Sequence, residues 1–239
     1  MNWIKQLKKK RMSRDTSPAL KRGEFKKMLM EEMEALPDFD FLHHKGGTYH
    51  FGRVRNFNQY PVYEGIHINF SLKEGVINGS VSSNFNPTYR FTNSYHTGIL
   101  NSHHDLLSLK RGAGITQDPA AAYFHNGQVD TTKRTIAQLV NDLLKVGLSF
   151  FDKRSLAFRS NQLLPTGLAF TDQLSSPKDE LRAAFEQEMR EVKFEITRIK
   201  HPLYLELKQS LQALPDQPRE LRQQIPGLAF SLIELYYQS

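Results

Sequence analysis

The hydrophobic positions of the chain follow a helical period, then an alternating period, and then a helical period again. The first helical stretch is predicted to begin with Ser17 as N-cap and Pro18 at the first helical position, and to end at Pro37. Gly23 weakens its first turns, because glycine is a poor helix former. The apolar stripe of this helix consists of Phe25, Met28, Leu29, Met33 and Leu36.

From Phe39 to Leu100 apolar and polar residues alternate, which predicts β-strands. The stretch FDFLHHKGGTYHF predicts a hairpin with two alternative turns. A two-residue Gly46–Gly47 turn pairs His43 with His50. A three-residue loop that also includes Lys45 instead places one set of side chains on a common face: Phe39, Phe41, His43, Tyr49 and Phe51.

The next strands show a cleaner alternation in EGIHINFSLKEGVINGSVSSNF. The inward side chains are predicted to be Ile66, Ile68, Phe70 and Leu72, and the outward ones His67, Asn69 and Ser71. Lys73 to Gly75 form the next turn, with Asn78–Gly79 as a competing one, and Ile77, Val81 and Phe85 continue the inward face. Residues 89–99 suggest one or two more strands. Short connections of this kind favour an antiparallel meander that needs a cover on one face.

That cover is predicted to be a helix in DTTKRTIAQLVNDLLKVGLSFFDK, with caps among Asp130 to Thr132. Its apolar stripe is Ile136, Leu139, Val140, Leu143, Leu144, Leu148 and Phe151, and its polar face is Lys133, Gln138, Asn141, Asp142 and Lys145. Before this helix, LKRGAGITQDPAAAYFHNGQ carries glycines, Pro119 and Asn126–Gly127. It predicts a loop long enough to carry function.

After Phe158 the pattern is helical to the end of the chain. One helix is predicted from about Pro177, with apolar positions at Leu181, Phe185, Met189, Val192, Ile196 and Ile199. Two further helices follow, with apolar positions at Leu203, Leu207, Leu211 and Leu214, and at Leu228, Leu232 and Leu235, separated by LPDQP. We therefore expect an α+β fold: an antiparallel meander sheet covered by the N-terminal and central helices and followed by a helical C-terminal extension. The predicted parts are a basic amphipathic leader (1–16), an α+β domain (17–158) and a helical C-terminal region (159–239).

The net charge of +7 is concentrated at the N-terminus. Residues 1–27 contain ten Lys and Arg against two acidic residues, which leaves 22 basic and 23 acidic side chains in the other 212 residues. The body is therefore close to neutral, and the basicity points to the leader as a contact with an anionic membrane surface, a partner protein or a nucleic acid. The residues predicted to dock are Trp3, Ile4, Leu7, Lys8, Lys9, Lys10 and Arg11. The competing interpretation is a solvated basic tail.

Eight of the nine histidines precede the central helix, which raises the question of a metal site. The adjacent pair His103–His104 is a poor chelator, because neighbouring side chains on a strand point to opposite faces. The best constellation is His43 and His50 with His96 or His103 and the carboxylate of Asp105. Because no recognised ligand spacing is present, we expect polar strand and loop histidines, with no metal and no cofactor. The chain also lacks a GxxxxGK phosphate loop and a GxSxG nucleophile elbow, and it has no cysteine.

Residues 24 to about 154 resemble small bacterial families of unknown function that are related to toxin-immunity proteins. The resemblance lies in the layout: a helix of the form FKKMLMEEME, a segment like FLHHKGGTYHF, a strand like GIHINFSL and a closing helix like TIAQLVNDLLKVGLSFFDK. It implies a noncatalytic, partner-binding α+β domain. It implies no catalytic residues.

We therefore expect a noncatalytic bacterial binding protein of immunity or accessory type, which acts through protein–protein contacts at the sheet face and the 101–128 loop. The predicted contact residues are Asn101, His103, His104, Asp105, Arg111 and His125. The alternatives are a metal-dependent hydrolase or nuclease using a histidine cluster, and a nucleic-acid adaptor using the basic leader. With no apolar run of eighteen residues and no secretory signal, we expect a cytoplasmic protein, or one peripheral to the inner membrane face.

Overall fold

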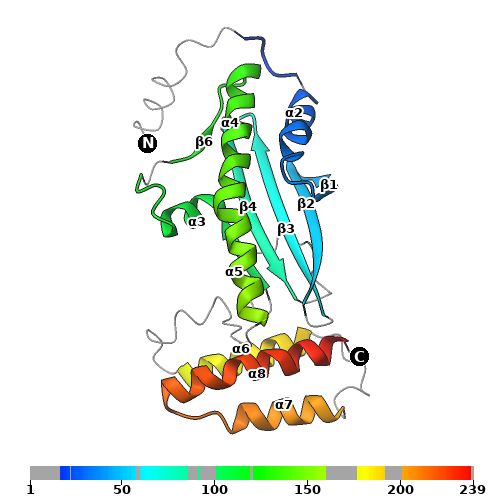
Figure 1. The fold of residues 1–239 in the computed structure, drawn as a ribbon, viewed down its shortest axis with the longest axis vertical. Helices are drawn as coiled ribbons and strands as arrows, with labels where there is room; N and C mark the ends of the chain where they lie inside the picture. The colour runs from blue at the N-terminus through cyan, green and yellow to red at the C-terminus, as the bar shows by residue number, and fades with distance from the viewer. Residues whose placement is uncertain are drawn as a thin grey trace. The chain divides into compact units, whose positions relative to one another are not determined.

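The computed structural model describes residues 17–21, 23–57, 60–85, 91, 101–118, 121–159, 177–191 and 201–237 (Figure 1). The predicted leader, residues 1–16, lies outside the described residues. The chain divides into two compact units, each assembled from separate segments. Of the described residues, the first unit comprises those within 17–53, 65–81 and 104–151, and the second those within 54–64, 82–103 and 152–237. The domain boundaries predicted at residues 16 and 158 stay a prediction.

The strands form an antiparallel sheet, in which β1 to β5 lie in the order of the sequence. Its order is β1 (Asp40–Lys45), β2 (Thr48–Phe57), β3 (Tyr60–Ser71), β4 (Val76–Asn84) and β5 (Asn101–Asp105), with β6 (Tyr123–Phe124) paired to β4. This confirms the predicted meander and the α+β class. Of the further strands predicted within residues 89–99, only Phe91 is described, and it lies in a turn.

The first hairpin adopts the two-residue turn. Lys45 pairs with Thr48 and His43 with His50, and both Gly46 (φ 59°) and Gly47 (φ 81°) lie in the left-handed region. Consecutive residues at positive φ match the right-handed twist of a hairpin, which two glycines allow without strain. The register then shifts between Phe41 and His43. The three-residue loop is therefore wrong, and exposed His43 does not share the face of buried Tyr49 and Phe51.

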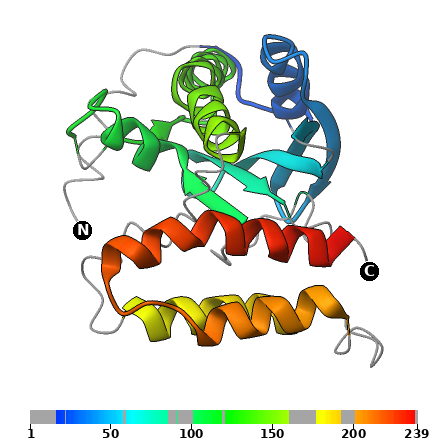
Figure 2. The same cartoon turned by 60° about the horizontal axis from the view of Figure 1, so that its bottom comes forward.

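In the first unit, helices α2 (Glu24–Met33) and α4 (Val129–Asp142) lie side by side on one face of the sheet (Figures 1 and 2). Their apolar stripes pack on the inward residues of the strands, as predicted. The cluster includes Phe25, Leu29, Phe51, Ile66, Ile68, Ile77, Val81, Ile136, Leu139 and Phe151. Two residues, one in β3 and one in the turn after it, do not have the predicted exposure. Leu72 is 55% exposed because it lies in the turn after Ser71, and His67, predicted to face outward, is 1% exposed.

The N-terminal helix begins later than predicted. Pro18 and Leu20 make backbone hydrogen bonds to Val129 and Gly127, and Ala19 forms a bridge with Gln128, so this segment is extended. The hydroxyl of Ser17 accepts from the backbone N–H of Asp130 and satisfies a donor at the start of α4. Ser17 therefore caps the central helix, and α2 starts after Gly23.

The central helix contains a π-helical segment, η2 (Leu143–Gly147), before α5 (Leu148–Arg159). A wider turn rotates the residues that follow relative to an ideal α-helix. Val146 and Gly147 are consequently buried, whereas Leu144, predicted to be core, is 39% exposed. Asp142 was predicted on the polar face, and it is buried instead.

The second unit contains α6 (Pro177–Glu191), α7 (Pro202–Gln212) and α8 (Pro218–Tyr237), which pack against one another (Figure 2). Their predicted apolar positions form one core with Tyr60, Val62 and Phe85 of the strand segments: Leu181, Phe185, Met189, Leu207, Leu211, Leu214, Leu228, Leu232 and Leu235. The predicted positions Val192, Ile196 and Ile199 lie outside the described residues. Within the described part of the chain, none of the helices has the length and apolar character needed to cross a membrane.

Candidate functional site

The predicted contact residues at 101–105 lie on β5 and at the start of α3 (Leu106–Gly112). The Asp105 carboxylate accepts from the backbone N–H of Ser108 at 3.0 Å and caps α3. His103 and His104 are half-buried, and the ring of His104 packs edge-on against Phe150 with centroids 5.1 Å apart. Asn101 starts β5. The 101–128 segment predicted as a loop thus contains the strand β5, the short helix α3 and the strand β6.

His125 and Arg111 differ in exposure. Arg111 is exposed in the last turn of α3. The buried ring of His125 stacks on Phe70, accepts from the backbone N–H of Gly127 at Nδ1, and lies with Nε2 3.2 Å from the carbonyl oxygen of Ser71. These partners fit a neutral ring with the proton on Nε2, donating to that carbonyl. The fold therefore uses the His125 side chain to attach the segment after β6 to the end of β3.

A buried polar triad that the sequence interpretation missed joins α3, β6 and α4. The Lys110 ammonium donates to Asp142 Oδ2 at 2.5 Å, and the Tyr123 hydroxyl donates to the same oxygen at 2.8 Å. Burial, and next the hydrogen bond to Asp142, raise the pKa of Tyr123 above its usual range. The triad is a structural clamp. One feature of the sequence could have indicated this triad. Asp142 lies three residues after Leu139, so its side chain is beside the apolar stripe of the helix.

Three histidines from neighbouring strands contact one another in the first unit. The Nδ1 atoms of His50 and His67 lie 2.9 Å apart, and the ring of His43 stacks on that of His50 with centroids 4.4 Å apart. One imidazole of the hydrogen-bonded pair must donate and the other accept. Burial, and then the charges of His43, His44 and Lys45, lower the pKa of His50.

The structure brings together His43 and His50 of the predicted metal constellation, while His96 lies outside the described residues. Among the residues that the structure describes, no group of three or more His, Asp and Glu side chains is arranged to hold a metal ion.

The second unit has its own charge network, in which Glu64 is buried, Arg55 half-buried and Asp152 exposed. Arg55 on β2 donates to Glu64 on β3, and its Nη1 donates to Asp152 on α5 at 2.9 Å. Glu64 is fully buried, so its charge needs this cation to offset the loss of hydration. The network therefore ties α5 to the strand segments of the same unit.

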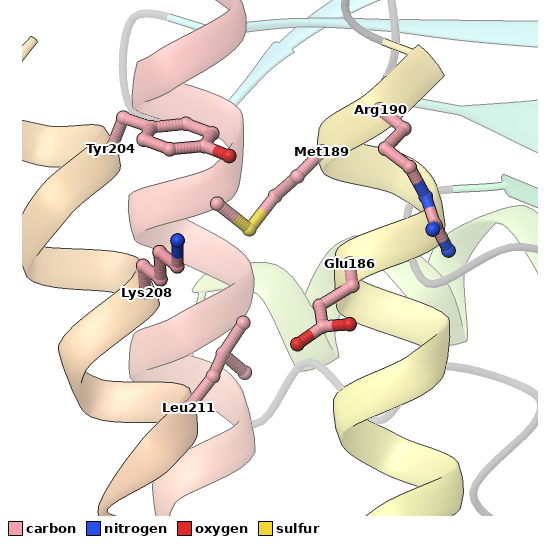
Figure 3. Close-up of a pocket in the computed structure, with 6 residues that line it drawn as sticks. All are labelled: Glu186, Met189, Arg190, Tyr204, Lys208 and Leu211. Carbon is pink, nitrogen blue, oxygen red and sulfur yellow. The ribbon is translucent and has the colours of Figure 1, made fainter. Parts of the chain in front are cut away.

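A pocket of about 230 Å³ lies between α6 and α7 of the second unit (Figure 3). Met189 and Leu211 are buried and belong to the core of the unit, so they form an apolar floor. Tyr204 is half-buried and contributes an aromatic wall. Three exposed charged side chains complete the lining: Glu186, Arg190 and Lys208. Figure 3 shows Met189 reaching into the space between the two helices, with Glu186 and Lys208 on opposite helices.

The charges of this lining differ from those of the adjacent surface. Lys178 pairs with Asp216 at 2.9 Å, and Arg182 lies 3.4 Å from Asp179. Within the described part of the chain, by contrast, Glu186 and Lys208 form no ion pair, and Arg190 donates only to the amide of Gln187, at 3.4 Å. The pocket thus combines an apolar floor with three charged side chains that form no ion pair with any described residue.

No protein-family model, curated protein or solved structure matches this chain.

Proposed function

We propose that this chain is a noncatalytic binding protein of immunity or accessory type, which acts in the bacterial cytoplasm by contacting another protein. The observation that carries the proposal is the α6–α7 pocket, with its apolar floor and three charged lining residues that form no ion pair within the described part of the chain. The choice of the immunity or accessory class rests on the resemblance that the layout of residues 24–154 shows to families related to toxin-immunity proteins.

The composition of the pocket supports a protein ligand. Tyr, Met and Arg are enriched at the centres of protein interfaces, and Tyr and Arg are common among the residues that dominate binding energy. Tyr204, Met189 and Arg190 supply these three types around one depression. An interface here would therefore have an apolar centre and a charged edge.

The size of the pocket also favours a protein ligand. Pockets for small molecules occupy roughly 300 to 1,000 Å³. At about 230 Å³ this pocket is smaller, and it suits one bulky side chain of a partner more than a whole substrate.

The buried ionisable groups support a structural role for the interior. Lys110, Asp142 and Tyr123 bond to one another, as do Arg55 and Glu64. Removal of one partner from such a pair would leave an uncompensated charge in the interior, so these groups are needed for the fold.

Purification of the untagged protein from its native host tests the proposal. We expect one protein to co-purify in stoichiometric amount, and to be lost with the variant Arg190→Glu/Lys208→Glu. The matched control is Lys133→Glu/Lys145→Glu, which makes the same charge change at two exposed positions of the first unit.

Absence of any stoichiometric protein partner would contradict the proposed function. A stoichiometric metal ion that is lost in a His103→Ala/His104→Ala variant would instead favour the hydrolase or nuclease alternative.

A further inference from the structure

We infer, building on the proposed protein-binding function, that the α6–α7 pocket receives an amphipathic helix with an acidic polar face, which inserts a bulky apolar side chain over Met189 and Leu211.

The helix arrangement supports a helical ligand. Tyr204, Lys208 and Leu211 are spaced along one face of α7, and Glu186, Met189 and Arg190 along one face of α6. Arg182 on α6 donates from Nε to the carbonyl oxygen of Leu211 at 3.1 Å, so the end of α7 lies beside an early turn of α6 and the two helices are antiparallel. A groove between two such helices accepts a further helix, as in helix bundles and helix-in-groove recognition.

The apolar floor determines where the ligand helix is anchored. Met189 and Leu211 belong to the core of the unit, yet both line the pocket. An apolar side chain placed there would extend the core without displacing a polar group. Methionine is flexible and polarizable, so it adapts to aliphatic or aromatic anchors.

The charge of the lining determines the polar face of the ligand. Arg190 and Lys208 carry two positive charges against one negative charge on Glu186. Their lack of ion-pair partners among the described residues leaves these cations available. Complementarity of charge therefore selects carboxylates beside the apolar anchor, and it rejects a lysine-rich helix.

A displayed peptide library tests this selection directly. The library has a helical design with Leu, Met, Phe or Ile at the apolar positions, and with Glu, Lys, Gln or Ser at the polar positions. Selection is carried out at physiological salt on the full-length protein, on Arg190→Glu/Lys208→Glu, and on the control Lys133→Glu/Lys145→Glu. The basic segment 1–27 attracts acidic peptides in all three proteins. The test therefore compares which peptides are enriched on one protein and not on the others.

We expect Glu to be enriched over Lys on the wild-type protein and on the control, and Lys over Glu on the pocket variant. The best Glu-rich peptide should lose at least about tenfold in affinity for the pocket variant and keep its affinity for the control. Failure to enrich any peptide, or the same Glu preference on the pocket variant, would overturn the inference. Neither result would contradict the proposed function, which the co-purification experiment tests separately.

Discussion

The Lys110 ammonium lies 2.5 Å from Asp142 Oδ2 inside the first unit, although these residues are 32 positions apart. This contact, with the hydrogen bond from Tyr123, attaches α3 and β6 to the central helix. Removing one partner of a buried ion pair leaves an uncompensated charge.

We predict that Asp142→Ala lowers the free energy of unfolding by about 3 to 5 kcal/mol, because Lys110 and Tyr123 lose their acceptor. Urea unfolding followed by circular dichroism measures the change. The neighbouring exposed residue provides the control, since Asn141→Ala should stay within about 0.5 kcal/mol. An effect of Asp142→Ala that also stays within about 0.5 kcal/mol would show that the pair contributes nothing to stability.

The π-helical segment gives two adjacent leucines different roles. Leu143 is 1% exposed and Leu144 is 39% exposed. Leu143→Ala should therefore cost about 2 to 5 kcal/mol through lost burial and a cavity, whereas Leu144→Ala should cost markedly less. The same urea titration distinguishes the two variants. A larger loss of stability for Leu144→Ala would show that the face of the helix assigned to the core is wrong.

The strand alternation predicted the meander correctly because each sheet residue faces one of two sides, and a regular period leaves little choice of register. The helix stripes were equally informative on α2, α4 and α6. The errors arose where long-range contacts override local pattern. Ser17 caps a helix that begins more than a hundred residues later, and the π-helical turn moved Leu144 out of the core.

The pocket was less predictable than the helices that build it. The spacing indicated that Met189 and Leu211 belong to apolar stripes, and the structure confirms that both are buried. No local pattern indicates which faces of α6 and α7 meet, because that depends on packing between helices. The charged residues Glu186, Arg190 and Lys208 were accordingly not singled out from the sequence.

The paired histidines predict a pH dependence of stability. The pKa of His50 is lowered in the folded protein, by burial first and then by His43, His44 and Lys45, so the unfolded chain binds the proton more readily. Stability should be fully present above the unfolded value of about 6.5 and should fall as the pH falls through it.

Thermal unfolding measured at pH values above and below about 6.5 checks that stability falls as the pH falls. The variant His50→Gln should lose part of the dependence, whereas His44→Gln, which alters an exposed side chain, should retain more of it. An unchanged pH profile in His50→Gln would exclude His50 as the source.

The basic leader predicts reversible attachment to anionic membranes. If Trp3, Ile4 and Leu7 insert while the adjacent lysines meet headgroups, each basic residue near the surface adds about 1 kcal/mol. Flotation should show capture by anionic vesicles, no capture by neutral ones, and loss in a Trp3→Ala/Ile4→Ala/Leu7→Ala variant. Wild-type protein that stays in solution with anionic vesicles at low salt would refute membrane attachment.

Hydrogen exchange of the full chain, with and without the protein that co-purifies with it, tests the binding surface most directly. Binding at the pocket should slow amide exchange in α6 and α7, because a docked helix covers both and suppresses their local opening. We predict this protection within residues 177–191 and 202–212, with little change on α4. Protection confined to residues 101–128, with none on α6 and α7, would contradict it and would place the partner on the surface predicted from the sequence.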